Sequence, residues 1–239
     1  MKRQSFWYIG AACALLFGAL VPAAAYANAR AMQTASVNPT VRTVIVDAGH
    51  GGFDGGAVAQ DGTLEKDINL AIAKRLCALL ECCDVDTVMT RTGDDSIHDP
   101  SCTSIRSQKI SDIRNRLHIM EQTEDSVFVS IHQNHFTQAK YHGTQVFYSG
   151  NDERSERLAH SIQTAVVSAL QPDNSREIKR SGTEIYLLYH AVRPAVMVEC
   201  GFLSNPEESQ LLRQPEYQTQ MAMAVLHGIL NYMQTTEEV

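Results

Sequence analysis

The sequence predicts an α/β domain of three layers, in which a sheet lies between helices. Two observations support this fold class. Short runs rich in β-branched residues are typical of buried strands, and longer runs with apolar residues three or four positions apart are typical of helices. The two kinds of run alternate along the chain, as they do in α/β folds. The 239 residues, 44% hydrophobic and 20% charged, are enough for one globular domain with a short extension.

The predicted strands are short and apolar. The first, residues 41–46, runs into the glycine-rich turn Asp47-Ala48-Gly49-His50-Gly51-Gly52, which indicates a buried strand that delivers a loop. The other predicted strands are residues 85–90, 127–131, 144–148, 185–188 and 195–198.

Four helices are predicted where apolar residues recur at helical spacing. They are residues 64–80 with Ile68, Ile72 and Leu76, residues 110–120 with Ile113, Leu117 and Met120, residues 155–170 with Leu158, Ile162 and Val166, and a last helix from 214 or 215 to 233. The polar residues 94–109 are expected to form a surface loop.

Residues 1–29 have the pattern of a secretory signal peptide. Lys2 and Arg3 precede an apolar run at 6–21, and Ala27-Asn28-Ala29 forms a cleavage site of the A-x-A kind. The run is shorter than the roughly 20 residues that span a bilayer, so a retained anchor is the less favoured alternative. The protein is therefore expected to be exported across the cytoplasmic membrane.

The remaining chain divides into a polar linker, residues 30–40, and a folded domain, residues 41–234. Loss of the leader removes Lys2 and Arg3 and no acidic residue, so the formal charge moves from −7 to −9. Binding to nucleic acid needs clustered lysine and arginine, so an acidic chain argues against nucleic acid as a partner.

Cysteine usage does not indicate a disulfide framework. One of the six cysteines, Cys13, lies in the leader, and the odd number that remains excludes complete pairing within the chain. Cys77, at an apolar position of a predicted helix, is expected in the core. For Cys82 and Cys83, pairing with a distant partner and a reduced state both stay open.

Polar residues follow three of the predicted strands and point to a site. His50, His132 and Glu199 stand at the carboxyl ends of these strands, where open α/β sheets bind their ligands. Glu65 lies in the first turn of the helix after the glycine-rich loop. Taken singly, each has an ordinary structural explanation, such as a carboxylate at a helix N-terminus for Glu65 or an ion pair with Arg193 for Glu199.

Together, these residue types indicate hydrolytic chemistry. Two imidazoles and one carboxylate with an open fourth position form the ligand set of hydrolytic zinc sites, so His50, Glu65 and His132 are predicted to bind zinc. Glu199 is then predicted to be the general base, because a carboxylate near the attacking water can take its proton and return it to the leaving amine.

Four motif blocks carry a resemblance to a known family. In chain order they are Val46-Asp47-Ala48-Gly49-His50-Gly51-Gly52, Leu64-Glu65-Lys66-Asp67, Ser130-Ile131-His132-Gln133-Asn134 and Val198-Glu199-Cys200-Gly201-Phe202-Leu203-Ser204-Asn205. Over about residues 41–234 the chain resembles the zinc-dependent N-acetylmuramoyl-L-alanine amidases with a type 3 catalytic domain.

The resemblance implies a fold, an activity and a role for each motif residue. The fold is a twisted, mainly parallel sheet flanked by helices on both faces, and residues 41–234 are the catalytic domain. The reaction is hydrolysis of the amide bond between N-acetylmuramic acid and L-alanine in peptidoglycan. His50, Glu65 and His132 are implied as zinc ligands, and Glu199 as the catalytic residue.

Within the family, the short chain and the segments 143–148 and 205–208 look most like the germination-specific amidases of the spore cortex. That likeness implies removal of peptide side chains on the way to muramic-δ-lactam, in the cell wall or the space between the forespore membranes. The sequence contains no evident wall-binding module, so a targeting or activating protein partner is expected, and the enzyme itself is expected to be a monomer.

Some positions depart from the family pattern, and a few other residues are candidate substrate contacts. Ala48, His135 and Cys200 are unusual, and His135 could enter the cleft or compete with His132 as a ligand. Asn134 and either Arg106 or Arg114 are candidate substrate contacts, with a structural role as the alternative.

The competing functions are a zinc peptidase or carboxypeptidase with the same ligands, a catalytically silent wall-binding module, and a serine or cysteine hydrolase. The last is disfavoured because no G-x-S-x-G elbow is present and Cys200 lies next to a carboxylate.

Overall fold

Six strands form one sheet in the computed structural model, which describes residues 41–234. Their order across the sheet is β2-β1-β3-β6-β4-β5, and β2, β1, β3 and β6 run parallel, while β4 pairs antiparallel with β6. The strands are β1 (Thr43–Ala48), β2 (Asp86–Met89), β3 (Ser126–Asn134), β4 (Gln145–Tyr148), β5 (Lys179–Arg180) and β6 (Ala195–Phe202). The predicted leader and linker lie outside the described residues.

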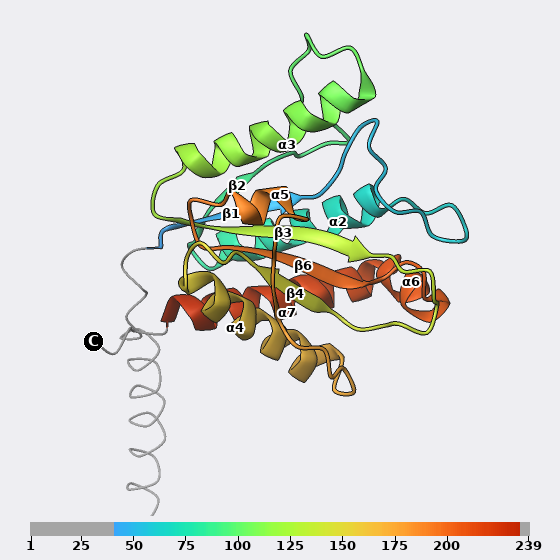
Figure 1. Ribbon diagram of the computed structural model, residues 1–239. Helices are drawn as coiled ribbons and strands as arrows, with labels where there is room; N and C mark the ends of the chain where they lie inside the picture. Colours follow the sequence, from blue (N-terminus) through green and yellow to red (C-terminus); the bar gives the residue numbers. More distant parts are fainter. Residues whose placement is uncertain (1–40, 235–239) are drawn as a thin grey trace, which may run out of the picture. The chain divides into compact units, whose positions relative to one another are not determined.

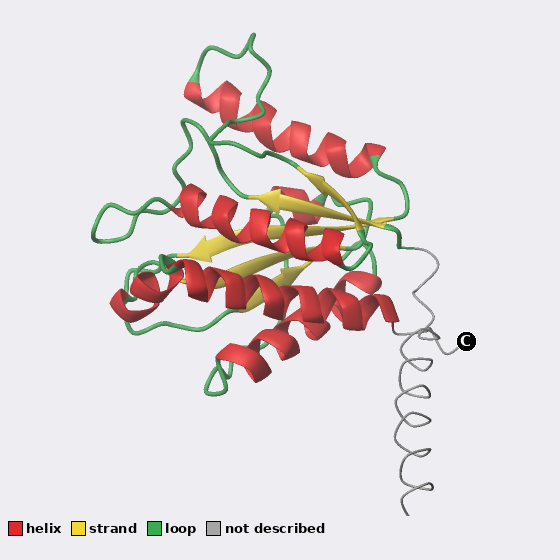
Figure 2. Cartoon of the chain, turned by 180° about the vertical axis from the view of Figure 1, so that it is seen from behind, coloured by secondary structure: helices red, strands yellow, loops and turns green. Residues whose placement is uncertain are grey.

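Helices cover both faces of the sheet, as Figures 1 and 2 show. One face carries the long helices α2, α4 and α7, which also pack against one another, and the other face carries α3 and α5. The helices are α2 (Glu65–Cys82), α3 (Ile105–Gln122), α4 (Arg154–Leu170), α5 (Tyr186–Tyr189), α6 (Pro206–Leu212) and α7 (Pro215–Gln234). The predicted three-layer α/β fold is therefore confirmed.

The two faces of the sheet bury different amounts of apolar surface. Side chains alternate between the faces of a strand, so Val44 and Val46 of β1 join the larger core beneath α2, α4 and α7. Ile45 faces the other way, into a smaller cluster with Phe128 and with Met120 of α3. Beyond this cluster, toward the carboxyl ends of the parallel strands, the same face carries polar side chains, and the site lies there.

The prediction of a strand at residues 185–188 is wrong. This segment forms the short helix α5, whose Leu187 and Leu188 are both buried in the smaller cluster together with Ile185. A strand would point consecutive side chains to opposite faces, whereas one helical turn can bury both leucines on one side. The edge of the sheet is formed instead by Lys179–Arg180, an exposed pair without any apolar pattern.

Helix α3 is longer than predicted, and helix α6 was not predicted. Helix α3 begins five residues before the predicted start, because Ser104 caps its first turn and forms a capping box with Ser107. Part of the expected surface loop 94–109 is therefore helical. Helix α6 was not predicted, although Asn205 caps it and Pro206 occupies its first turn, as helix starts favour.

Strands β3 and β6 continue past the predicted ends. His132 and Glu199 were expected at the ends of their strands, but β3 runs on to Asn134 and β6 to Phe202. The apolar pattern is interrupted because His132 and Glu199 face the polar site, while the backbone ladder continues with these two residues opposite each other.

Cys77 is buried in the core, as predicted, and Cys82 and Cys83 are exposed. Among the described residues, Cys77, Cys82, Cys83, Cys102 and Cys200 are free thiols. No helix within residues 41–234 is long and apolar enough to cross a membrane.

The contact between α4 and α7 yields a test of the packing. A Cβ added at Gly228 of α7 would lie 2.5 Å from the Cα of Ile162 in α4, so we expect Gly228→Ala to lower the free energy of unfolding. Overpacking typically costs about 1–3 kcal/mol, which exceeds the gain of up to about 1 kcal/mol in helix propensity. Urea denaturation measures the difference. Gln220→Ala, at an exposed position of α7, is the control, and equal stability of the Gly228 variant and wild type would contradict this packing.

Candidate metal centre

His50 lies in a loop whose backbone is unusual for a histidine. It follows β1 by two residues and has a φ of 62°, and Gly51 and Gly52 have φ of 135° and 56°. Glycine adopts these conformations readily, but other residues do so at a cost in free energy. The ring of His50 is held at Nδ1, which lies 3.0 Å from the carboxylate of Asp54. Its Nε2 consequently faces the site.

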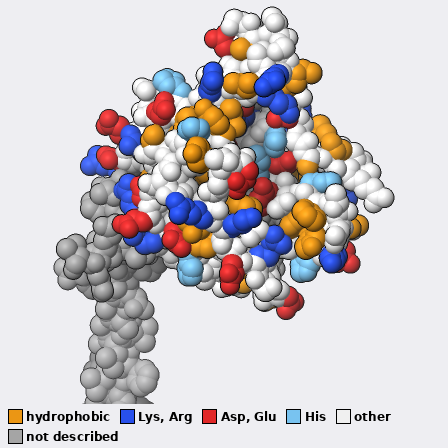
Figure 3. Space-filling model, viewed as in Figure 1, with side chains coloured by type: hydrophobic (Ala, Val, Ile, Leu, Met, Phe, Trp, Pro, Cys, Tyr) orange, Lys and Arg blue, Asp and Glu red, His pale blue; other side chains and the backbone are white. Residues whose placement is uncertain are grey.

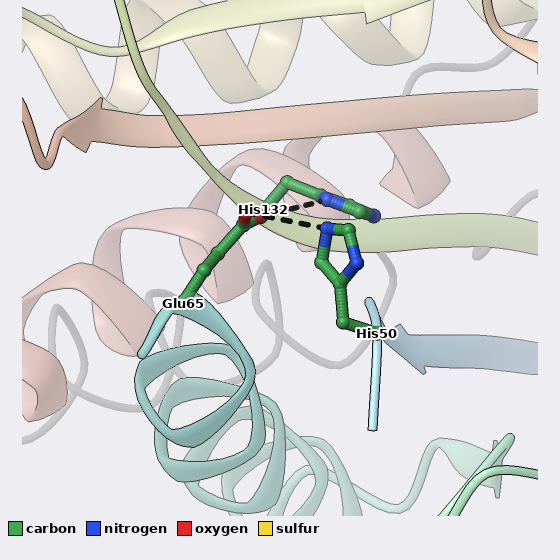
Figure 4. Close-up of side chains that lie close together, drawn as sticks. All are labelled: His50, Glu65 and His132. Atoms are coloured by element: carbon green, nitrogen blue, oxygen red, sulfur yellow. Dashed lines mark hydrogen bonds and ion pairs between the residues drawn. The ribbon is translucent and has the colours of Figure 1, made fainter. Parts of the chain in front are cut away.

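Glu65, in the first turn of α2, contacts both histidines (Figure 4). Its Oε2 lies 3.2 Å from Nε2 of His50, and its Oε1 lies 3.0 Å from Nδ1 of His132. The backbone N–H groups of Ala57 and Gln133 donate to Oε2 and Oε1, at 2.8 and 3.0 Å. The buried carboxylate is thus fixed in position on both oxygens.

The charges of this cluster support one another. Burial would raise the pKa of Glu65, but hydrogen bonds and charges from His132 and His50 hold it well below its usual range. Burial would lower the pKa of His50, but hydrogen bonds from Asp54 and Glu65 outweigh burial and raise it to about 9. The site therefore holds an ionised carboxylate, the form that binds a cation.

The backbone register places Glu199 between two polar side chains on the face of the sheet. His132 of β3 is its partner on one side and Gln145 of β4 on the other. Burial raises the pKa of Glu199 to about 7, although the nearby charge of His132 opposes this. Its Oε2 is buried without a hydrogen-bond partner. Arg193, the partner considered from the sequence, donates instead to the carbonyl of Thr123.

The residues present fit a zinc ion. One donor atom from each of His50, Glu65 and His132 lies within 4.8 Å of the others, and nitrogen and carboxylate donors in a set of three leave a fourth position open. Glycines allow this close approach: a Cβ at Gly49 would lie 2.2 Å from Nε2 of His132, and one at Gly56 would lie 2.6 Å from Oε2 of Glu65. The unpartnered oxygen of Glu199 adds a candidate proton acceptor.

A cleft opens over the two histidines, between α3 and the segment before α5. Apolar side chains such as Ile113, Tyr186 and Met197 line it together with polar ones such as Lys109 and Glu184. Figure 3 shows histidine and acidic side chains gathered in a hollow on this face. His50 and His132 both line this cleft, so the cluster borders it.

Other residues singled out from the sequence lie elsewhere. His135 is exposed, beyond the end of β3, and does not belong to the metal-binding group. Arg106 and Arg114 are exposed, and neither they nor Asn134 line the cleft.

Sequence reasoning missed Arg116, which does line the cleft and is buried. It lies four residues before Met120 and three after Ile113, on the side of the predicted helix that faces the core. A charged residue in that position was the available signal.

Asp47, at the end of β1, is a second buried charge that sequence reasoning missed. It is fully buried, pairs with Arg116, and accepts hydrogen bonds from the hydroxyl groups of Thr90 and Ser130. Burial would raise the pKa of Asp47, but Arg116 and the hydrogen bonds hold it below its ordinary value of 3.8.

Replacement of Asp47 tests this pair. At neutral pH, Asp47→Asn leaves Arg116 with Asp112 as its remaining acidic partner, and we expect the free energy of unfolding to fall by about 3 kcal/mol. The pKa of Asp47 in the folded protein lies below 3.8. The stabilisation that its ionised carboxylate provides is therefore present above pH 3.8 and is lost as the pH falls through the folded pKa. The difference from wild type should therefore narrow in urea unfolding as the pH falls below 3.8. Asp86→Asn, at an exposed position, is the control, and a difference that does not depend on pH would contradict this assignment.

Comparison with known proteins agrees with this site and fold. The family model for N-acetylmuramoyl-L-alanine amidases matches residues 44–231. The germination-specific N-acetylmuramoyl-L-alanine amidase of Bacillus subtilis is 35% identical over 191 residues, which cover 80% of this chain and 79% of that protein.

Solved structures give the same result. The CwlD amidase from Clostridioides difficile, in complex with the GerS lipoprotein, superposes with a TM-score of 0.77 at 40% identity, covering 80% of this chain and 98% of that chain. The amidase AmiC2 of Nostoc punctiforme has a TM-score of 0.69 at 31% identity, covering 83% and 99%. The chain belongs to the N-acetylmuramoyl-L-alanine amidase family.

Proposed function

We propose that this protein is a zinc-dependent amidase that hydrolyses the bond between N-acetylmuramic acid and L-alanine in peptidoglycan. The observation that carries the proposal is the convergence of His50, Glu65 and His132 on one point, with the unpartnered carboxylate oxygen of Glu199 on the neighbouring strand. Family membership supports the choice of bond.

In this proposal, His50, Glu65 and His132 hold the ion. When bound, zinc lowers the pKa of water to about 7 and polarises a carbonyl oxygen. Asp54 orients the ring of His50 through Nδ1 and is itself held by Lys109, whose Nζ lies 2.8 Å from its other oxygen. Carboxylates behind a ligating histidine fix its tautomer and its orientation.

Glu199 is proposed to move the proton. A carboxylate whose pKa lies near 7 can accept a proton from the attacking water and then donate it to the nitrogen of the leaving L-alanine. The unpartnered Oε2 supports this role, since an oxygen already engaged in hydrogen bonds would be a weaker base.

A zinc peptidase acting on wall peptides would use the same ligands and base, and the products separate the two functions. We expect the purified protein with zinc to release peptides with free L-alanine amino termini from peptidoglycan sacculi, detected by mass spectrometry, and to lose this activity after chelation. We expect Glu199→Gln to lower the rate by about 100- to 10,000-fold, the usual contribution of a general acid–base group. Glu207→Gln, an exposed carboxylate on α6, is the matched control.

The outcomes differ for each competing function. Cleavage between amino acids with the sugar–alanine bond intact would indicate a peptidase. Full activity of Glu199→Gln would remove that residue from the proposed mechanism. Zinc binding without any cleavage would favour the silent wall-binding module or a missing activator.

We also propose a role in the spore cortex, toward muramic-δ-lactam and germination. The likeness to a germination-specific amidase, at 35% identity over 80% of this chain, supports it. The signal-peptide pattern at residues 1–29 supports export to the cortex compartment. The related CwlD structure contains a lipoprotein partner, which supports the proposal that this enzyme also works with a targeting or activating protein.

Binding to the substrate tests the need for a partner. If targeting depends on another protein, the purified chain without its leader should bind intact cortex sacculi weakly in a sedimentation assay, because the partner would then supply most of the affinity for the wall. Tight binding by the purified chain alone would contradict the need for a targeting partner.

A further inference from the structure

We propose that Arg116 of α3 and Arg91, two residues after β2, are positioning residues that hold His50 in the conformation that binds zinc. The inference rests on the proposed metal site and adds to it two side chains outside the ligand set. Both guanidinium groups are buried, with Arg91 4% and Arg116 3% exposed. Both donate to backbone carbonyls of the loop that carries His50.

Arg116 connects α3 to this loop. Its NH2 group donates to the carbonyl of His50 itself at 2.7 Å, and its NH1 group donates to the carbonyl of Ala48 at 2.9 Å. The charge is balanced by Asp47 and Asp112. Every part of the guanidinium is therefore engaged, which fixes its own position.

Arg91 holds the same loop from the other side. It donates to the carbonyls of Ala48 and Gly49 at 2.9 and 3.1 Å, and also to the carbonyl of Lys66 at 2.8 Å. Lys66 is the neighbour of Glu65. Arg91 therefore connects the end of β1, which leads to His50, with the first turn of α2, which carries Glu65. We call the two arginines, with the carbonyls of Ala48, Gly49 and His50 that they bind, the arginine clamp.

The clamp explains how His50 keeps its backbone conformation. A non-glycine residue with φ of 62° is held in a sparsely populated region only when its surroundings over-determine it. Three successive carbonyls, those of Ala48, Gly49 and His50, accept from the two guanidinium groups. Without these bonds the loop can relax, and Nε2 of His50 moves away from Glu65.

Zinc affinity of the purified protein tests the clamp, measured by competition with a chromophoric chelator. We expect Arg116→Met to weaken zinc binding by about 10- to 100-fold, as loss of groups that orient metal ligands does. Arg116→Lys should recover only part of the affinity, because an ammonium cannot reproduce the fork of donors. Arg91→Met should also weaken zinc binding.

The matched control separates positioning from general stability. Met120→Ala removes a fully buried side chain from the same helix without touching the loop carbonyls, so it should ease unfolding of the metal-free protein and leave zinc affinity within about twofold of wild type. If Arg116→Met does not fold, the double variant Asp47→Asn with Arg116→Met removes the fully buried carboxylate together with the guanidinium that pairs with it. The other partner of Arg116, Asp112, keeps its hydrogen bonds from Ser96 and Ile97. The double variant should show the same loss of affinity.

Each outcome bears on one claim. Wild-type affinity in Arg116→Met, or in the double variant, would overturn the clamp while leaving the metal site intact. An equal loss in Met120→Ala would also overturn it, because loosening of α3 alone would then explain the effect. Absence of zinc binding by the wild-type protein would overturn the metal site itself, and the clamp with it.

Discussion

In the centre of the sheet, backbone hydrogen bonds between β3 and β6 hold His132 directly opposite Glu199. A slip of this pairing by one residue would turn every side chain of one strand to the other face. The valines that now lie in the larger core would turn toward α3 and α5, and the proposed base would lie beneath α2 and α7. The large burial of Val129, Ile131, Val196 and Val198, all 0% exposed, thus maintains the geometry of the site.

The polar part of the site is built around charged side chains that the fold buries away from water. Glu65 and Asp47 are both buried, and each is surrounded by donors from several elements: backbone N–H groups and histidines around Glu65, hydroxyl groups and a guanidinium around Asp47. A buried charge is tolerated only when it is paired and hydrogen-bonded. These networks join strands, loop and helices whose sequence positions are far apart, so the site can form only when the whole fold is complete.

Much of the fold and the core of the site could be predicted because short stretches of sequence carry patterns typical of them. Apolar periodicity marked the long helices and the central strands, and the four motif blocks marked His50, Glu65, His132 and Glu199. The signals failed where structure depends on distant contacts. The edge strand Lys179–Arg180 has no apolar pattern to reveal it, and the pair Leu187-Leu188 is equally compatible with a strand until its neighbours are known. The part that Arg116 plays could not be predicted because three of its acceptors, in Asp47, Ala48 and His50, lie 66 to 69 residues away in the sequence.

The two edges of the sheet have shorter strands than its centre, which affects whether strands of other chains can pair with it. The strands there, β2 and β5, have only four and two residues, and β5 consists of two exposed basic residues. Short, charged edges offer few unpaired backbone groups and repel a strand that would extend the sheet. Strand addition, the route by which many sheet proteins aggregate, is therefore disfavoured for the part of the chain that the structure describes. Association with another molecule is therefore expected to use side-chain surfaces rather than strand pairing at these edges.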